Sequence, residues 1–107
     1  MGIITIKSNA DFQKAYARGT SRVGPSLVLY RFPNREAFAR FGFVASKRVG
    51  KAVVRNRLRR VLKEICRRNE GSFTPGYDYV VVARPRAANE DYGMLEEQLL
   101  SLVKGFR

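Results

Sequence analysis

The chain has 107 residues, 45% of them hydrophobic, and a formal net charge of +12. This size predicts one domain over residues 1–107, and the charge makes a polyanion the leading class of partner. The absence of histidine excludes a histidine general base, and the single cysteine excludes an internal disulfide and the common zinc fingers. With no apolar run long enough to cross a membrane, no secretory signal and one unpaired cysteine, we expect a cytoplasmic protein.

The first predicted element is a helix that starts near Ser8. Ser8 can cap the helix, Asp11 places an acid in the first turn, and Gly19 can end it. Phe12 and Tyr16 then share one face of the helix. At that spacing, two aromatic residues are more often packed in a core than used for binding.

Two strands are predicted next, over residues 26–32 and 40–47, with turn residues between them. Their closeness in the sequence predicts a β-hairpin. A third strand, over residues 77–83, has the most β-prone composition in the chain, which favours the centre of the sheet.

Residues 47–68, "KRVGKAVVRNRLRRVLKEICRR", hold most of the charge, since ten Lys or Arg and one acid give a net +9. The segment is predicted to form an amphipathic helix that packs on the sheet. Its apolar stripe consists of Val54, Leu58, Val61, Leu62 and Ile65, and the basic residues lie on the other side. Cys66 is expected to be a small, partly buried residue beside this stripe.

A last helix is predicted to begin after residues 89–91, which gives the order α-β-β-α-β-α. This order predicts a small two-layer sandwich of the α/β (α+β) class. The second and third strands, joined through the basic helix, should lie parallel, and crossovers of this kind are almost always right-handed.

The uniform charge of the basic helix needs an explanation. A merely solvated face usually mixes charges of both signs, and a membrane-surface helix needs large apolar side chains that are free to enter lipid. Arg outnumbers Lys seven to three in this segment, and a guanidinium fork matches two phosphate oxygens. The segment therefore predicts contact with the phosphates of a nucleic acid.

Residues 46–60, "SKRVGKAVVRNRLRR", resemble the signature of the bacterial ribonuclease P protein component. Three other stretches resemble that family's first helix, first strand and last strand; these are "NADFQKAYARGTS" (9–21), "LVLYRF" (27–32) and "DYVVVARP" (78–85). The resemblance implies a left-handed crossover, against the general rule. The first eight residues are largely apolar where the family often has a basic extension, so their role stays open.

The resemblance also implies a function. The family is the protein subunit of a ribonucleoprotein endonuclease that removes the 5′ leader of precursor tRNA. The expected partners are ribonuclease P RNA and precursor tRNA, with no membrane and no DNA. Catalysis is expected in the RNA subunit with its Mg²⁺ ions, so that this chain supplies no catalytic residue and holds no metal tightly.

Two groups of binding residues are carried over by position. Those expected to bind the catalytic RNA are Lys47, Arg48, Lys51, Arg55, Asn56, Arg57, Arg59, Arg60, Lys63 and Arg67. Those expected to bind the leader, in a cleft between the first helix and the sheet, are Phe12, Tyr16 and Tyr30.

Other interpretations stay open at this point. The charge alone fits a non-catalytic RNA-binding module, such as a small ribosomal protein, equally well. Asn56 could be only a hydrogen-bonding residue near the start of the helix. The acids Glu90, Asp91, Glu96 and Glu97 could suggest a metal-dependent nuclease, but acids in the first turns of a helix also favour its dipole.

Overall fold

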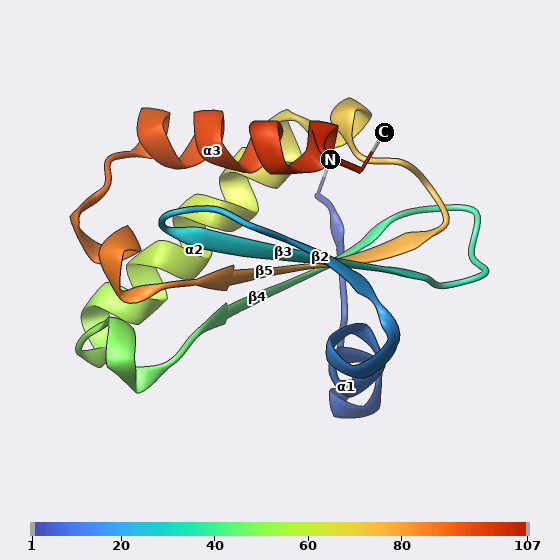
Figure 1. The fold of residues 1–107 in the computed structure, drawn as a ribbon, viewed down its shortest axis with the longest axis horizontal. Coiled ribbons are helices and arrows are strands. Elements are labelled where there is room, and N and C mark those ends of the chain that lie inside the picture. Colours follow the sequence, from blue (N-terminus) through green and yellow to red (C-terminus); the bar gives the residue numbers. More distant parts are fainter. Residues whose placement is uncertain (1, 107) are drawn as a thin grey trace.

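A computed structural model describes residues 2–106 of the chain (Figure 1). The helices are α1 (Asn9–Arg18), α2 (Ala52–Arg68) and α3 (Tyr92–Lys104). The strands are β1 (Ile4–Thr5), β2 (Thr20–Val23), β3 (Leu27–Pro33), β4 (Arg40–Ala45) and β5 (Tyr77–Ala83). Three short 3₁₀ helices are η1 (Lys47–Val49), η2 (Glu70–Ser72) and η3 (Pro85–Asn89).

The predicted helix signals are confirmed. The Ser8 hydroxyl accepts a hydrogen bond from the Ala10 N–H, and Gly19 follows the last residue of α1. At α3, Asp91 is the capping residue, and its carboxylate accepts from the Met94 N–H at 2.8 Å. Local polar groups therefore fix both helix starts, as the sequence indicates.

The five strands form one sheet in the order β1-β4-β5-β3-β2. The predicted hairpin is wrong, because β5 lies between β3 and β4 and pairs with both, antiparallel to β3 and parallel to β4. The physical reason is burial: Tyr79, Val80 and Val81 are all buried, and such a strand needs neighbours on both sides. The central position of this strand and its parallel pairing with β4 through α2 are confirmed, whereas the hand of that crossover stays a prediction.

The sequence did not predict the two edge strands. β1 has only two residues, and β2 is exposed along its whole length, so neither shows the alternation of apolar and polar residues that marks a half-buried strand. β2 forms its backbone pairs with β3 alone, so its position depends on a tertiary contact.

One face of the sheet is closed by α2 and α3, which contact each other; in Figure 1 α3 runs across the top and α2 rises obliquely toward it from the lower left. The predicted stripe of α2 is confirmed: Leu58, Leu62 and Ile65 are fully buried, and the two valines of the stripe pack against the same core. Cys66 is completely buried rather than partly buried. The mixed α+β class is therefore confirmed, with the main core between the sheet and these two helices.

On the opposite face, α1 is the only helix among residues 2–106 (Figure 1). Ile6, Ala15 and Val80 form a small buried cluster beneath α1. Gly42 is essential to this packing, because a Cβ atom there would lie 2.4 Å from the Phe12 ring. A single short helix cannot cover five strands, so part of this face stays open.

Candidate nucleic-acid interface

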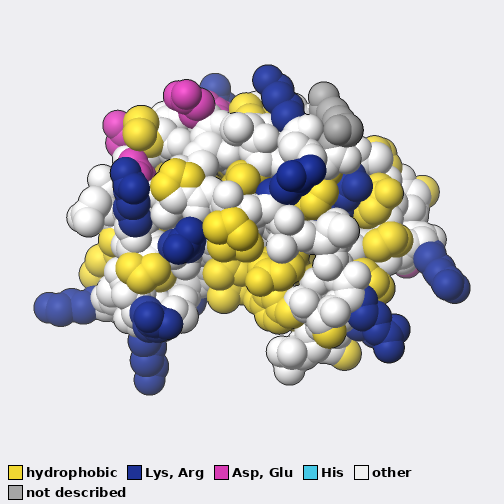
Figure 2. Space-filling model, in the orientation of Figure 1, with side chains coloured by type: hydrophobic (Ala, Val, Ile, Leu, Met, Phe, Trp, Pro, Cys, Tyr) yellow, Lys and Arg dark blue, Asp and Glu magenta, His cyan; other side chains and the backbone are white. Residues whose placement is uncertain are grey.

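The predicted RNA-binding residues all lie on one continuous segment, η1 and the polar side of α2. Those that are exposed are Lys47, Arg48, Lys51, Asn56, Arg57, Arg60, Lys63 and Arg67. Figure 2 shows Lys and Arg side chains projecting from the side of the molecule where η1 and the start of α2 lie in Figure 1. Gly50, with φ of 153°, forms the turn between the two elements.

Asn56 has a specific partner. Its side-chain oxygen accepts a hydrogen bond from Nη1 of Arg59 at 2.7 Å, and Nη2 of the same guanidinium donates to the Ala45 carbonyl at 3.2 Å. Asn56 makes no capping bond at the start of α2, where the cap is Lys51. Asn56 therefore helps to hold Arg59 against the end of β4, which turns a flexible side chain into a positioned one.

Two further arginines flank the stripe. Nη2 of Arg57 donates to the Ala88 carbonyl at 3.3 Å, which joins the start of α2 to η3. Arg55 is half-buried, and its buried Nε has no hydrogen-bond partner among residues 2–106. A buried donor of this kind calls for a partner from outside the chain, such as an anion or water.

Arg67 differs from the other predicted residues because it is already paired. Its Nε and Nη2 donate to both oxygens of Glu64, at 2.6 and 2.5 Å. This hydrogen-bonded pair lowers the pKa of Glu64 and raises the pKa of Arg67. Arg67 therefore offers less unpaired charge to a phosphate than Arg60 or Lys63.

The three predicted leader-binding residues come together on the open face of the sheet. Phe12 and Tyr16 of α1 and Tyr30 of β3 are half-buried and pack against the small cluster beneath α1. The rings of Tyr16 and Tyr30 meet edge to face, with their centroids 5.1 Å apart. Burial, with a smaller contribution from Tyr30, raises the pKa of Tyr16. These aromatics both support the core and present part of their surface.

This surface contains further residues that were not predicted from the sequence. Phe32, Val44 and Val82 are half-buried on the same face and pack against the same cluster. Figure 2 shows hydrophobic surface in the middle of the molecule, between α1 and the basic segment. Alternation along β3 could have indicated Phe32, which lies two residues after Tyr30, but the valines resemble any core valine.

The acidic side chains are not arranged as a metal site. Within residues 2–106, no group of three His, Cys, Asp or Glu side chains is placed to hold a metal ion. Asp91 caps α3, and Glu96 accepts a hydrogen bond from Asn69 at 2.8 Å. The described chain also contains no helix with the length and apolarity needed to span a membrane.

The family model for ribonuclease P matches residues 4–107. The chain belongs to the ribonuclease P protein family. The ribonuclease P protein component of Desulforamulus reducens is 44% identical over 96 residues, which cover 90% of this chain and 85% of the relative. That of Alkaliphilus metalliredigens is 38% identical over 99 residues, which cover 92% of this chain and 89% of the relative.

Solved structures of ribonuclease P proteins share the fold. The protein from Thermotoga maritima superposes with a TM-score of 0.86 at 32% identity, over 94% of each chain. The protein from Staphylococcus aureus gives a TM-score of 0.88 at 30% identity, over 96% of this chain and 94% of that one. The five-stranded sheet and three helices are therefore those of ribonuclease P proteins.

Proposed function

We propose that this chain assembles with ribonuclease P RNA and assists removal of the 5′ leader from precursor tRNA. The observation that carries the proposal is the juxtaposition of two surfaces on a member of this family. One surface is the basic side of η1 and α2, and the other is the half-exposed aromatic face beside α1. The first suits a structured RNA, and the second suits a single strand.

The basic surface would bind the catalytic RNA through its phosphates. The predicted cations that are exposed and make no ion pair within residues 2–106 are Lys47, Arg48, Lys51, Arg57, Arg60 and Lys63, while Arg59 is held in place by Asn56. The unpartnered Nε of Arg55 would gain an acceptor from a phosphate oxygen. If about six cations meet phosphates, log K for assembly should fall against log[salt] with a slope of roughly −4 to −5.

The aromatic face would receive the leader. Leaders vary in sequence, and stacking suits a variable strand because every base has a π-face. Tyr30 lies at the centre of this face, between Tyr16 of α1 and Val80 of β5, with which it is paired. The chain would hold the leader here while the tRNA body is held by the RNA subunit.

Mg²⁺ ions bound to the RNA subunit would activate the attacking water and stabilise the developing charge. The residues of this chain would act by other means. The cations of α2 offset repulsion between the two RNAs, and the aromatics fix the leader so that its junction with the tRNA is presented to the active site. We place this assembly in the cytoplasm, where the unpaired Cys66 would stay reduced.

The test is cleavage by separate and combined subunits. Purified protein should not cut precursor tRNA at any magnesium concentration. Addition of the catalytic RNA should give magnesium-dependent cleavage at the leader junction, faster at low salt than the RNA achieves alone. Glu96→Gln and Glu97→Gln should leave that rate unchanged, because neither carboxylate lies on the two proposed surfaces.

Three results would contradict the proposal. Cleavage by RNA-free protein that both glutamate changes abolish would mean a protein nuclease. Co-purification of ribosomal RNA, in place of one RNA of a few hundred nucleotides, would mean a ribosomal module. A salt slope shallower than about −2 would mean that the basic surface is not the main RNA contact.

A further inference from the structure

The two flanks of α1 differ in chemistry. Ala15 is fully buried where α1 rests on the sheet. Helical spacing places Phe12 and Tyr16 on one side of this contact line, and Lys14 and Arg18 on the other. The first side borders the aromatic face described above, and the second borders a separate hollow.

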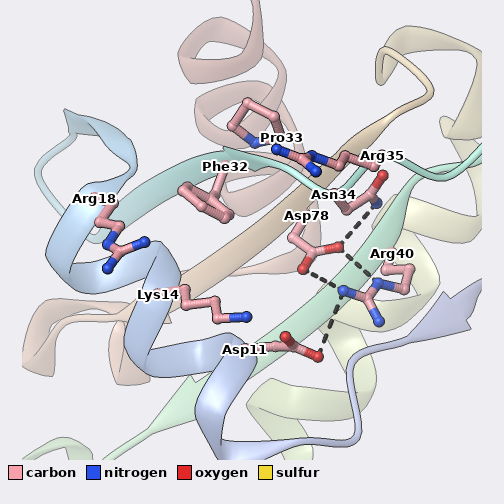
Figure 3. Close-up of a pocket in the computed structure, with 9 residues that line it drawn as sticks. All are labelled: Asp11, Lys14, Arg18, Phe32, Pro33, Asn34, Arg35, Arg40 and Asp78. Atoms are coloured by element: carbon pink, nitrogen blue, oxygen red, sulfur yellow. Dashed lines mark hydrogen bonds and ion pairs between the residues drawn. The ribbon is translucent and has the colours of Figure 1, made fainter.

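That hollow is a pocket of about 320 Å³ between α1, β3 and the loop after β3 (Figure 3). It is lined by Asp11, Lys14, Arg18, Phe32, Pro33, Asn34, Arg35, Arg40 and Asp78. Figure 3 shows the Lys14 ammonium and the Arg18 guanidinium projecting from α1 toward the space beside the Phe32 ring. The pocket therefore combines an aromatic wall with cations from α1, from the loop after β3 and from β4.

Both acids of the pocket, Asp11 and Asp78, already form ion pairs with Arg40. Arg40 donates two hydrogen bonds to the buried Asp78 carboxylate, at 2.8 and 2.7 Å, and Asn34 donates a third at 2.9 Å. The same Arg40 lies 3.5 Å from the Asp11 carboxylate. These two carboxylates are thus balanced largely by one guanidinium.

Three cations of the pocket remain without a carboxylate. Lys14, Arg18 and Arg35 are exposed, and none of them makes an ion pair or hydrogen bond through its side chain with any residue in the range 2–106. Arg35 lies in the turn after β3, with φ of 62°. The Asn34 side-chain oxygen stabilises this turn by accepting a hydrogen bond from the Glu36 N–H at 2.8 Å. Four cations against two carboxylates leave the lining at +2.

The position of the pocket separates it from the basic surface of α2. The loop after β3 lies at one end of the sheet in Figure 1, and η1 with the start of α2 lies at the other end. However, Phe32 lies two residues beyond Tyr30 on the same face of β3. Both side chains pack against the cluster beneath α1, so apolar side chains connect the proposed leader cleft on one side of α1 with the pocket on the other.

We propose that this pocket binds a backbone phosphate of the single-stranded leader after the strand has crossed α1. Lys14 and Arg18, with Arg35 opposite them, would contact the phosphate, and Phe32 would lie against the adjacent sugar or base. This inference rests on the proposed function, because the strand reaches the pocket from the Tyr30 side. A helix is about 10–12 Å across, so only leaders extending several nucleotides beyond the cleft reach the pocket.

The test uses the reconstituted holoenzyme and precursor tRNAs with leaders of graded length. Single leader phosphates are replaced by neutral methylphosphonates, one at a time. In the wild type, one replacement upstream of the nucleotides that depend on Tyr30 should weaken binding about two- to five-fold, the size expected for an exposed ionic contact. Lys14→Ala and Arg18→Ala should lower affinity for long leaders only, and should abolish the effect of that one replacement.

Matched variants control the experiment. Lys104→Ala removes an exposed cation from the end of α3, which covers the opposite face of the sheet, and should leave the methylphosphonate profile unchanged. Lys14→Arg should keep the wild-type profile. The salt slope for long leaders should become shallower by about 0.7 when the contact is lost.

The outcomes separate the two proposals. If Tyr30→Ala weakens leader binding while Lys14→Ala and Arg18→Ala change nothing at any leader length, this inference is overturned and the leader cleft stands. If Tyr30→Ala has no effect, the leader cleft itself is wrong. Weaker assembly with the catalytic RNA, or binding of inorganic phosphate to the free protein without any change in the leader profile, would also overturn the leader assignment.

Discussion

The two faces of the central sheet are built from alternate residues of the same strands, yet they end in different states. On the side of α2 and α3, Leu29 of β3, Phe41 of β4 and Val81 of β5 are fully buried. On the side of α1, their neighbours Tyr30 and Val82 are only half-buried. Two helices close the first face, and one helix of 10 residues leaves the second partly open.

We infer from this difference that the closed face contributes most of the stability and that the open face is available for binding. The closed face holds the larger core, in which Phe41, Phe73 and Tyr79 form an aromatic cluster with centroids 5.0–5.9 Å apart. The open face holds a smaller core, together with the Arg40–Asp78 ion pair. If the open face accepts a variable strand, as we propose, it cannot be fully packed within the protein, because packed atoms leave no area for a ligand.

The largest expected effect is on the closed face. Leu58→Ala should lower the free energy of unfolding by about 2–5 kcal/mol, because Leu58 is fully buried and the change leaves a cavity. Urea denaturation measures this loss. Arg60→Ala, two residues further on the exposed side, should change stability by less than about 0.5 kcal/mol while weakening assembly with the RNA. Unfolding caused by Arg60→Ala would remove the distinction between the two sides of α2.

Stability on the open face should depend on the ion pair. Arg40→Met should cost about 2–3 kcal/mol, because it leaves the buried Asp78 carboxylate without its cation. This value lies below that for a fully buried pair because about a quarter of the Arg40 side chain is exposed, at 24%, so solvent screens part of the interaction. The double variant Arg40→Met with Asp78→Asn should recover part of the loss. A double variant less stable than Arg40→Met would show that the charge of Asp78 was not the cause.

The next effect concerns binding on the open face. Tyr30→Ala should weaken binding of precursor tRNA to the holoenzyme by about 1–3 kcal/mol, the value for one stacked base. Binding of mature tRNA, which has no leader, should stay the same, and Tyr30→Phe should retain most of the affinity because stacking needs only the ring. Equal losses for precursor and mature tRNA would reduce Tyr30 to core packing.

The smallest effect concerns Arg67 at the end of α2. Hydrogen bonding to Arg67 lowers the pKa of Glu64, so the pair is complete above the ordinary Glu pKa and is lost only as pH falls through the lowered value. Glu64→Gln should therefore free Arg67 at neutral pH and strengthen assembly with the RNA slightly. The advantage over wild type should vanish at acidic pH, where Glu64 is protonated. Glu70→Gln removes a more exposed acid that makes no ion pair within residues 2–106, and an equal gain from that change would show a general charge effect.

Much of the molecule was determined by the sequence itself. The caps at Ser8 and Asp91, the apolar stripe of α2 and the β-prone run of β5 act through neighbouring residues, so local patterns predict them. The basic segment was equally clear, since ten cations within 22 residues cannot be neutralised locally by Glu64 alone. The resemblance to the family also predicted that Tyr30 lies with Phe12 and Tyr16 of α1, and the structure brings the three onto one face of the sheet.

Only the tertiary structure decided the rest. Insertion of β5 between β3 and β4 overturned the hairpin, because pairing between strands depends on which partners bury the central strand and not on distance along the chain. The same insertion brings Asp78 beside Arg40, 38 residues away in the sequence, and so forms the charged pocket next to α1. Long-range pairing of this kind leaves no periodic signal, because each residue meets its partner only after the sheet has formed.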